Sequence, residues 1–272
     1  AIALVSCNTV PSDIDVAPPT VKRTDLYFGY FNSKGDQVQR TKGHVNIFME
    51  GFYDGEDQAV QNVLDMKVDS MIDLSWHAWY RDPSGGYYSV RTDAEDSLRR
   101  IFKKFQDAGA LKYVKYLYPI DEPNNTVGVD NRTELEYGLA TIRKIAYEFP
   151  ELNGVKYVTI YSADKPFVGV DLFDLVGVDD YRSKSAIFSE NGGAYTMLRN
   201  QIEPWQKTVI VPGCGGFDPY KTELVQDPIP FVYYAETHPE ISMIIAFTWF
   251  DTSHPGCGSN GWANAYLNAG DY

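Results

Sequence analysis

Eight short apolar runs, separated by amphipathic or polar segments, constrain the fold of this chain more than any other feature of its sequence. Each run is apolar almost throughout rather than alternating, which is typical of parallel strands that are covered on both faces. The chain is therefore predicted to have an α/β fold built on a parallel sheet. The eight runs are Leu26–Phe31, Val45–Met49, Met71–Trp76, Tyr113–Ile120, Val155–Tyr161, Leu175–Tyr181, Thr208–Pro212 and Ile241–Phe250.

Two of the intervening segments carry clear helix signals. Thr92 and Glu95 have the spacing of a capping box, and the apolar stripe that follows them ends at Gly109. The pair Thr133 and Glu136 repeats this spacing before a second stripe. Shorter helices are expected in three further segments, Asp57–Met66, Tyr195–Trp205 and Phe231–Thr237.

Eight strands with mostly helical crossovers favour a single (β/α)8 TIM-type barrel, which typically needs about 250 residues. The 272 residues of the chain accommodate one such barrel, assigned to residues 23–272. The first crossover is expected to be irregular, because Asn32–Gly43 is polar and holds no convincing helix. An open doubly wound sheet is the alternative, but no glycine-rich phosphate loop follows the first strand to support it.

The N-terminal segment resembles a bacterial lipoprotein signal. Residues Leu4-Val5-Ser6-Cys7 fit a lipobox, and a polar, proline-rich stretch follows as far as residue 22. Residues 1–22 are interpreted as a signal remnant and tether, with Cys7 as the lipidation site. The protein is then expected to be exported and held at a bacterial membrane by its lipid anchor alone. The alternative is a short apolar strand that contains a cysteine by chance.

The remaining cysteines, Cys214 and Cys257, both follow late strands, so an exported protein could join them in a disulfide. Two free thiols in glycine-rich loops are the alternative. The formal net charge of −13 argues against nucleic acid or an anionic membrane surface as a partner. The four histidines lack metal-ligand spacing and no Cys-x-x-Cys occurs, so neither a metal nor another cofactor is expected.

The strongest catalytic signal is Asp121-Glu122-Pro123, where an apolar run ends in two adjacent carboxylates. Acids at the carboxyl ends of barrel strands are where such folds carry their chemistry. Other strand ends add acidic and aromatic residues, which suit a polysaccharide or oligosaccharide because sugars stack on rings and donate hydroxyls to carboxylates. These residues are Glu50, Asp73, Trp76, His77, Trp79, Asp179, Asp180, Tyr181, Trp249 and Asp251, and Tyr87 and Tyr88 are further candidates for stacking.

The Asp121-Glu122-Pro123 motif resembles the acid/base site of (β/α)8 glycoside hydrolases. In their largest clan the motif is Asn-Glu-Pro, so Glu122 matches the acid/base residue and Asp121 replaces the asparagine. That clan also has a nucleophilic glutamate at the seventh strand, whereas Val211–Phe217 contains none. The resemblance implies a glycosidase and leaves its second catalytic group open.

Substrate-assisted hexosaminidases and chitinase-like enzymes offer a second resemblance, because they place an Asp and a Glu together at the fourth strand. This resemblance implies that Asp121 orients a 2-acetamido group, that Asp180 and Tyr181 support it, and that Trp249 forms the floor of the site.

An inverting mechanism is a third possibility, with Glu122 as the acid and Asp179, Asp180 or Asp251 as the base. Asp-Glu-Pro is also an ordinary way to begin a helix. A catalytically inactive barrel that binds glycan is therefore kept as the alternative function.

Overall fold

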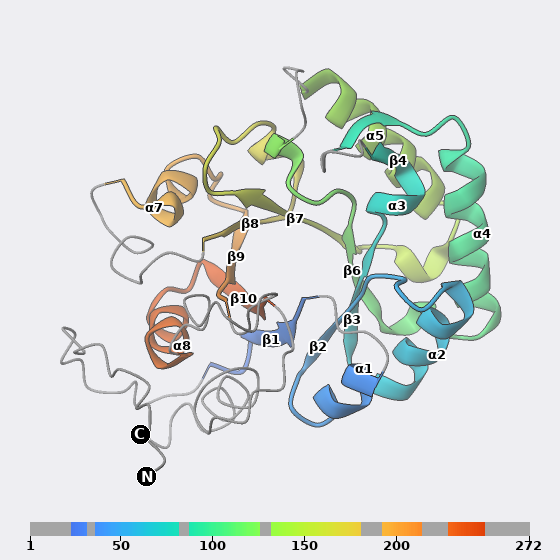
Figure 1. The fold of residues 1–272 in the computed structure, drawn as a ribbon, viewed down its shortest axis with the longest axis horizontal. Coiled ribbons are helices and arrows are strands. Elements are labelled where there is room, and N and C mark those ends of the chain that lie inside the picture. The colour runs from blue at the N-terminus through green and yellow to red at the C-terminus, as the bar shows by residue number, and fades with distance from the viewer. Residues whose placement is uncertain are drawn as a thin grey trace, which may run out of the picture.

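The computed structural model describes residues 23–31, 36–81, 87–125, 132–180, 192–213 and 228–247. Eight of its strands form one parallel sheet in the order β1-β10-β9-β8-β7-β6-β3-β2. The strands are arranged in a ring, with the helices outside it (Figure 1). Their bounds are β1 Tyr27–Tyr30, β2 Ile47–Glu50, β3 Asp69–Asp73, β6 Val114–Tyr118, β7 Lys156–Ser162, β8 Leu175–Asp179, β9 Lys207–Val211 and β10 Ile241–Ala246. The prediction of a (β/α)8 barrel is confirmed.

Side chains on these strands divide between two cores. The barrel interior holds a smaller apolar cluster that includes Met71, Tyr118 and Leu175. The larger cluster, with Ile72 and Val176, lies on the outer side of the strands against the helices. Because successive strand residues point to opposite faces, membership of these two clusters shows which way each strand-end residue points.

Helices cover the outside of the barrel. They are α1 Asp36–Thr41, α2 Glu56–Met66, α3 Ser75–Ala78, α4 Ala94–Asp107, α5 Arg132–Ala146, α7 Ala194–Arg199 and α8 Pro228–Thr237. The first crossover contains the six-residue helix α1, so the expectation that it held no helix was wrong. Between β7 and β8 the connection contains only the short 3-10 turn Val170–Leu172. No helix among the described residues is both long enough and apolar enough to cross a membrane.

Helix α4 shows how packing can replace a predicted cap. Its apolar stripe is buried as expected, with Leu98, Ile101, Phe102 and Phe105 among the least exposed residues. The predicted capping box at Thr92 is not formed, because the helix begins after Asp93 without a side-chain cap. The Thr92 hydroxyl instead lies 3.0 Å from that of Tyr80. Burial of the stripe therefore stabilises this helix without the box.

A β-hairpin interrupts the connection between β3 and α4. Strand β4, Trp79–Arg81, pairs antiparallel with β5, Tyr87–Val90. The hairpin follows α3 directly, so it stands at the carboxyl end of the barrel strands. It places Arg81 near the strand-end acids, as described below.

Asn46 bridges β1 and β2 where the barrel closes. Asn46 accepts a hydrogen bond from Phe28 N at 2.6 Å and donates one from Nδ2 to Leu26 O at 3.0 Å. Its own backbone N–H donates to Phe28 O at 3.1 Å. Gly29 permits this approach, since a Cβ there would lie 2.5 Å from Ile47 O. Asn46 thus supplies the contacts that a regular strand pair would make.

We expect Asn46→Leu to destabilise the barrel by about 2–3 kcal/mol, because it removes the two hydrogen bonds that the Asn46 side chain makes, with Phe28 N on β1 and with Leu26 O just before it. Urea unfolding of the variant would measure this loss. Asn200→Leu, at the C-cap of α7 and remote from the seam, serves as the control. An unchanged unfolding midpoint in the Asn46 variant would contradict the role of this side chain in closing the barrel.

A candidate active site at the carboxyl end of the barrel

Three polar residues at the strand ends, Asp73, Tyr118 and Asp179, point into the barrel mouth. Asp73 lies two residues after the interior residue Met71 on β3, so both face the interior, and Asp73 is the register partner of Tyr118 on β6. Asp179 lies four residues after the interior residue Leu175 on β8 and faces the same way. Because every strand of the ring is parallel, these side chains meet at one end of the barrel. The architecture therefore brings together acids that lie more than 100 residues apart in the sequence.

Asp121 joins this group through Tyr118. The Tyr118 hydroxyl donates a hydrogen bond to Asp121 Oδ1 at 2.5 Å. Burial raises the pKa of Asp121 to about 7, although the Tyr118 hydrogen bond acts in the opposite direction and neighbouring Asp73 and Glu122 add to the rise. Burial also raises the pKa of Asp73 to about 6. Both carboxyls therefore keep their protons to higher pH than an exposed aspartate does.

Tyr118 reports the electrostatic environment of the mouth. Its side chain is fully buried, and its pKa is raised well above the usual value by burial and then by the charges of Asp121, Asp73 and Asp179. The phenol therefore stays protonated and acts as a fixed hydrogen-bond donor. Sequence analysis treated it as part of an apolar strand. The signal that it faces inward is its two-residue spacing from Tyr116, which packs against the same interior cluster.

Glu122 has a backbone conformation that is unusual for a residue with a side chain. Its φ is +43°, in the left-handed region that favours glycine. Its backbone N–H donates to Ile160 O on β7 at 3.0 Å, and Asn125 Nδ2 donates to its Oε2 at 2.8 Å. Asn124 fixes the following turn by donating to Ser162 O at 2.8 Å. Glu122 thus combines a strained backbone with an anchored side chain beside Asp121. Strained residues of this kind cluster at functional sites.

Two further residues at the mouth were not predicted. Tyr53, just after β2, is about half buried. This partial burial, together with the charges of Asp73 and Asp121, raises its pKa. Arg81, at the end of β4, lowers the pKa of both acids by its positive charge, against the larger effect of burial. Neither residue ends a strand of the barrel, which is why sequence analysis of the strand ends passed over both.

The two tryptophans of this region have different environments. Trp76 is 43% exposed and remains a candidate platform for a sugar ring. Trp79 is 3% exposed, and its Nε1 donates to Pro119 O at 2.9 Å. A Cβ on Gly138 of α5 would lie 2.2 Å from its ring. The expectation that Trp79 binds substrate is therefore corrected: its ring fills the core between the hairpin and α5.

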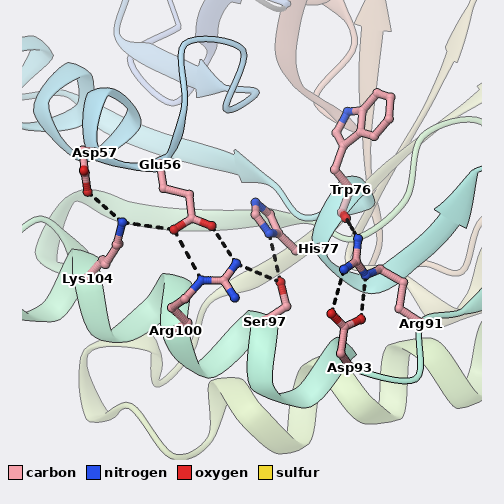
Figure 2. A network of polar contacts seen from close by, with 9 residues as sticks. All are labelled: Glu56, Asp57, Trp76, His77, Arg91, Asp93, Ser97, Arg100 and Lys104. Atoms are coloured by element: carbon pink, nitrogen blue, oxygen red, sulfur yellow. Dashed lines mark hydrogen bonds and ion pairs between the residues drawn. The ribbon is translucent and has the colours of Figure 1, made fainter.

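His77 also faces away from the barrel mouth. Its Nδ1 lies 3.2 Å from Ser97 Oγ on α4, and its ring packs edge-on against Phe52 at 4.6 Å between centroids. Figure 2 shows the imidazole beside the Glu56–Arg100 pair. Burial lowers the pKa of His77 to about 4, so the ring is neutral near pH 7. Its predicted contact with substrate is thus replaced by a structural role between α3 and α4.

Glu50 is buried outside the barrel rather than in its mouth. It directly follows the interior residue Met49 on β2, so it faces the outer side of the barrel. Its carboxylate accepts hydrogen bonds from Phe52 N at 2.7 Å and from Asn62 Nδ2 on α2 at 2.9 Å. Both contacts hold the chain that leaves β2. The expectation that Glu50 binds substrate is corrected accordingly.

Stability should fall with rising pH because of Glu50. Burial raises its pKa from 4.5 to about 7, so the folded state prefers the protonated form. This contribution is complete below pH 4.5 and is lost as pH rises to about 7, at a cost of up to about 3 kcal/mol. We expect Glu50→Gln to lose less stability than wild type between pH 4.5 and 8 in urea unfolding. Identical pH dependence in the two proteins would contradict this.

Several predicted residues remain untested. Asp180 is buried just after β8, whereas Asp179 is the residue whose charge acts on Tyr118, so our preference at this strand end moves to Asp179. The structure does not describe several of the predicted positions: Tyr181, Trp249, Asp251, the side chains of Tyr87 and Tyr88, the tether 1–22, Cys7, Cys214 and Cys257.

Within the described ranges, no group of three or more His, Cys, Asp or Glu side chains could hold a metal ion.

Comparison with solved structures shows what kind of barrel this is. An endo-β-1,3-glucanase of family GH128 from Sorangium cellulosum superposes with a TM-score of 0.57 and 11% identity, over 90% of this chain and 98% of the other. The chain therefore shares the barrel fold of this enzyme. A GH17 β-1,3-glucanosyltransferase from Rhizomucor miehei gives a TM-score of 0.51 and 13% identity, over 84% of this chain and 88% of that one.

A third structure contains bound sugar. Saccharomyces cerevisiae Gas2p, solved with laminaritetraose and laminaripentaose, gives a TM-score of 0.51 and 11% identity, over 85% of this chain and 57% of its own. Sequence comparison adds nothing further, since no family description and no curated protein sequence matches the chain. At such low identity these structures establish the fold alone.

Proposed function

We propose that this protein is a glycoside hydrolase that cleaves an extracellular or cell-envelope polysaccharide, with Glu122 as general acid/base. The observation that carries the proposal is the cluster of Asp73, Asp121 and Asp179 around Tyr118, with Glu122 beside it, at the carboxyl end of the barrel. Such crowding of carboxyls in a buried site costs stability, so its presence favours a functional role for them. Glycosidic cleavage needs a carboxyl that gives a proton and a second group that stabilises the oxocarbenium-like centre.

The second group distinguishes three mechanisms. In substrate assistance, Asp121 orients a 2-acetamido group, and the Tyr118 hydrogen bond supports that role by fixing the carboxyl. In inversion, Asp179 serves as the base on water, which its inward position at the mouth supports. Double displacement needs a nucleophile at the seventh strand of the barrel, which is β9. Neither β9 nor the described residues after it, Pro212 and Gly213, include an acid. The first two mechanisms therefore fit the site better.

Product release from a panel of polysaccharides tests the proposal. The panel begins with a β-1,3-glucan, because the similar barrels named above include enzymes of that class, and continues with chitin, mannan, galactan and bacterial envelope polymers. Cleavage restricted to N-acetylated polymers would support substrate assistance. Cleavage of a neutral polymer would support Asp179 as the base if NMR shows that the anomeric centre of the product is inverted. No cleavage of any polymer that the protein binds would overturn the hydrolase.

A catalytically inactive barrel that binds glycan is the second candidate. The lack of an acid on β9 and in Pro212–Gly213 favours it, since a retaining enzyme would use one there. Such a barrel would bind oligosaccharide through exposed rings such as Trp76 and would tolerate loss of Glu122. Calorimetric titration of wild type and Glu122→Gln with the same oligosaccharide should give equal affinities for either function, so product release separates the two: a bound oligosaccharide that wild type leaves intact would favour binding alone.

We further propose that the protein is exported and anchored through a lipid on Cys7, on the strength of the lipobox Leu4–Cys7. Mass spectrometry of the native protein should find a diacylglyceryl mass on a peptide that begins at Cys7. An unmodified peptide that continues upstream through Cys7 would refute the anchor.

A further inference from the structure

A short chain of polar contacts ends on the carboxyl of Glu122. Asn125 Nδ2 donates a hydrogen bond to Glu122 Oε2 at 2.8 Å, and Lys165 Nζ donates one to Asn125 Oδ1 at 2.6 Å. Within the described part of the chain, Oε1 of the same carboxyl makes no hydrogen bond. The two oxygens of Glu122 therefore differ, because the protein engages Oε2 and leaves Oε1 to a substrate.

Lys165 fixes the direction in which the Asn125 amide faces. An ammonium group can only donate hydrogen bonds, so the amide oxygen must turn toward Lys165 Nζ. The amide nitrogen then turns toward Glu122 and donates to Oε2. A protonated carboxyl could accept from either orientation or donate to it, whereas the ammonium permits only one. Lys165 thus decides the orientation even when Glu122 carries a proton.

The turn after β7 holds Lys165 beside this amide. Asn124 Oδ1 accepts a hydrogen bond from Ser162 N at 3.0 Å, and Asn124 Nδ2 donates to Ser162 O at 2.8 Å and to Lys165 O at 3.1 Å. Asn124 therefore binds the backbone of the turn, and Asn125 binds the lysine side chain. Because Lys165 is exposed, its contact with a neutral amide contributes only modestly to stability. Its main consequence is the orientation of the amide.

We propose that Asn125 and Lys165 are positioning residues that keep the catalytic proton of Glu122 on Oε1. This inference rests on the proposed function. During cleavage the proton passes from Oε1 to the glycosidic oxygen, which keeps the electron pair of the C–O bond that breaks. Water supplies a hydroxyl to the sugar and a proton to the site. The negative charge left on the carboxyl is stabilised at Oε2 by the hydrogen bond from Asn125.

Reversal of the amide would place the proton on the wrong oxygen. If Asn125 Oδ1 faced Glu122, it would accept a hydrogen bond from a proton on Oε2, and that proton would be withheld from the substrate. Loss of the Lys165 ammonium permits this reversal. An aspartate at position 125 imposes it, because both of its oxygens accept hydrogen bonds. Both changes should therefore lower kcat.

Asn125→Asp tests the inference, because aspartate has nearly the size of asparagine and can still accept from Lys165. Its kcat is expected to fall about tenfold or more through loss of a charge-assisted hydrogen bond, while KM changes by no more than about twofold. Asn153→Asp is the matched control, because Asn153 is exposed and follows the 3-10 turn Pro150–Leu152 before β7. Wild-type kcat in Asn125→Asp would overturn the inference.

Substitution of Lys165 provides the second readout. Lys165→Met keeps the length of the side chain and removes its charge, so kcat should fall about threefold. Lys165→Arg should restore most of this loss, because a guanidinium also only donates. Equal kcat values in wild type and Lys165→Met would contradict the role of the ammonium, as would failure of arginine to restore activity.

Proton–nitrogen NMR of the side-chain amides examines the contacts without any need for activity. The Asn125 signal is assigned by its loss in Asn125→Asp. It should move in Lys165→Met and in Glu122→Gln, and it should stay in place in Asn153→Asp. A signal that neither substitution moves would refute the chain of contacts. If the signal moves but no polymer is cleaved, the proposed hydrolase fails. If a polymer is cleaved and kcat ignores Asn125→Asp, only the positioning role fails, so the two failures are distinguishable.

Discussion

Glu122→Gln is expected to lower the rate of polysaccharide cleavage by about 10²- to 10⁴-fold, the usual contribution of general acid–base catalysis. Glutamine keeps the size of the side chain and an oxygen that can accept the hydrogen bond from Asn125 Nδ2. The barrel should therefore remain folded, and the loss should appear in kcat rather than in sugar affinity. Product release by wild type and variant, on whichever polymer the wild type cleaves, measures the effect.

A matched glutamate at the other end of the barrel provides the control. Glu151 lies in the 3-10 turn Pro150–Leu152 before β7 and accepts a hydrogen bond from Gln106 Nε2 at 3.1 Å. Glu151→Gln should retain full activity. If Glu122→Gln also retains it, Glu122 is not the acid/base, and Asp121 becomes the carboxyl to replace next.

The backbone of Glu122 allows a second check on the same residue. Glycine adopts its φ of +43° without strain, so Glu122→Gly should relieve a conformation that costs about 1–2 kcal/mol. The greater freedom of glycine in the unfolded chain offsets part of this gain. We expect the unfolding free energy to stay within about 1 kcal/mol of wild type while activity is lost. A large loss of stability would mean that the Glu122 side chain supports the fold.

Trp79→Ala is expected to destabilise the protein by about 3–5 kcal/mol, as for other fully buried aromatic residues. The substitution empties the space between the hairpin and α5 and leaves Pro119 O without its donor at 2.9 Å. Because Pro119 lies two residues before Asp121, the altered packing should also disturb the site. Denaturant unfolding with a tryptophan-independent signal, such as circular dichroism, measures the loss.

Trp76→Ala is the matched comparison, since the two tryptophans are three residues apart. Trp76 is partly exposed, so its removal should change stability by less than about 1 kcal/mol and weaken oligosaccharide binding instead. Retained stability in Trp79→Ala with a loss of sugar affinity would contradict the assignment of Trp79 to the core.

Strand positions and the parallel sheet followed from local sequence, because doubly covered strands need nearly continuous apolar runs. The Asp121-Glu122-Pro123 motif was also visible there, since an acid pair before a proline ends such a run. Which neighbouring side chains face the mouth was decided by tertiary structure alone. Glu50 and Asp73 both end strands, yet one binds α2 and the other faces the interior. A single residue of register decides between these faces.

The sequence by itself thus determined a barrel of eight parallel strands with acids at the strand ends. Only the tertiary structure separated the exposed Trp76 from the buried Trp79, and it added Tyr53, Arg81 and Tyr118 to the mouth. The physical reason is that an apolar pattern involves only a few neighbouring residues, so a short stretch of sequence reveals it. Burial and electrostatic interaction depend on partners from distant segments, which only the closed barrel brings together.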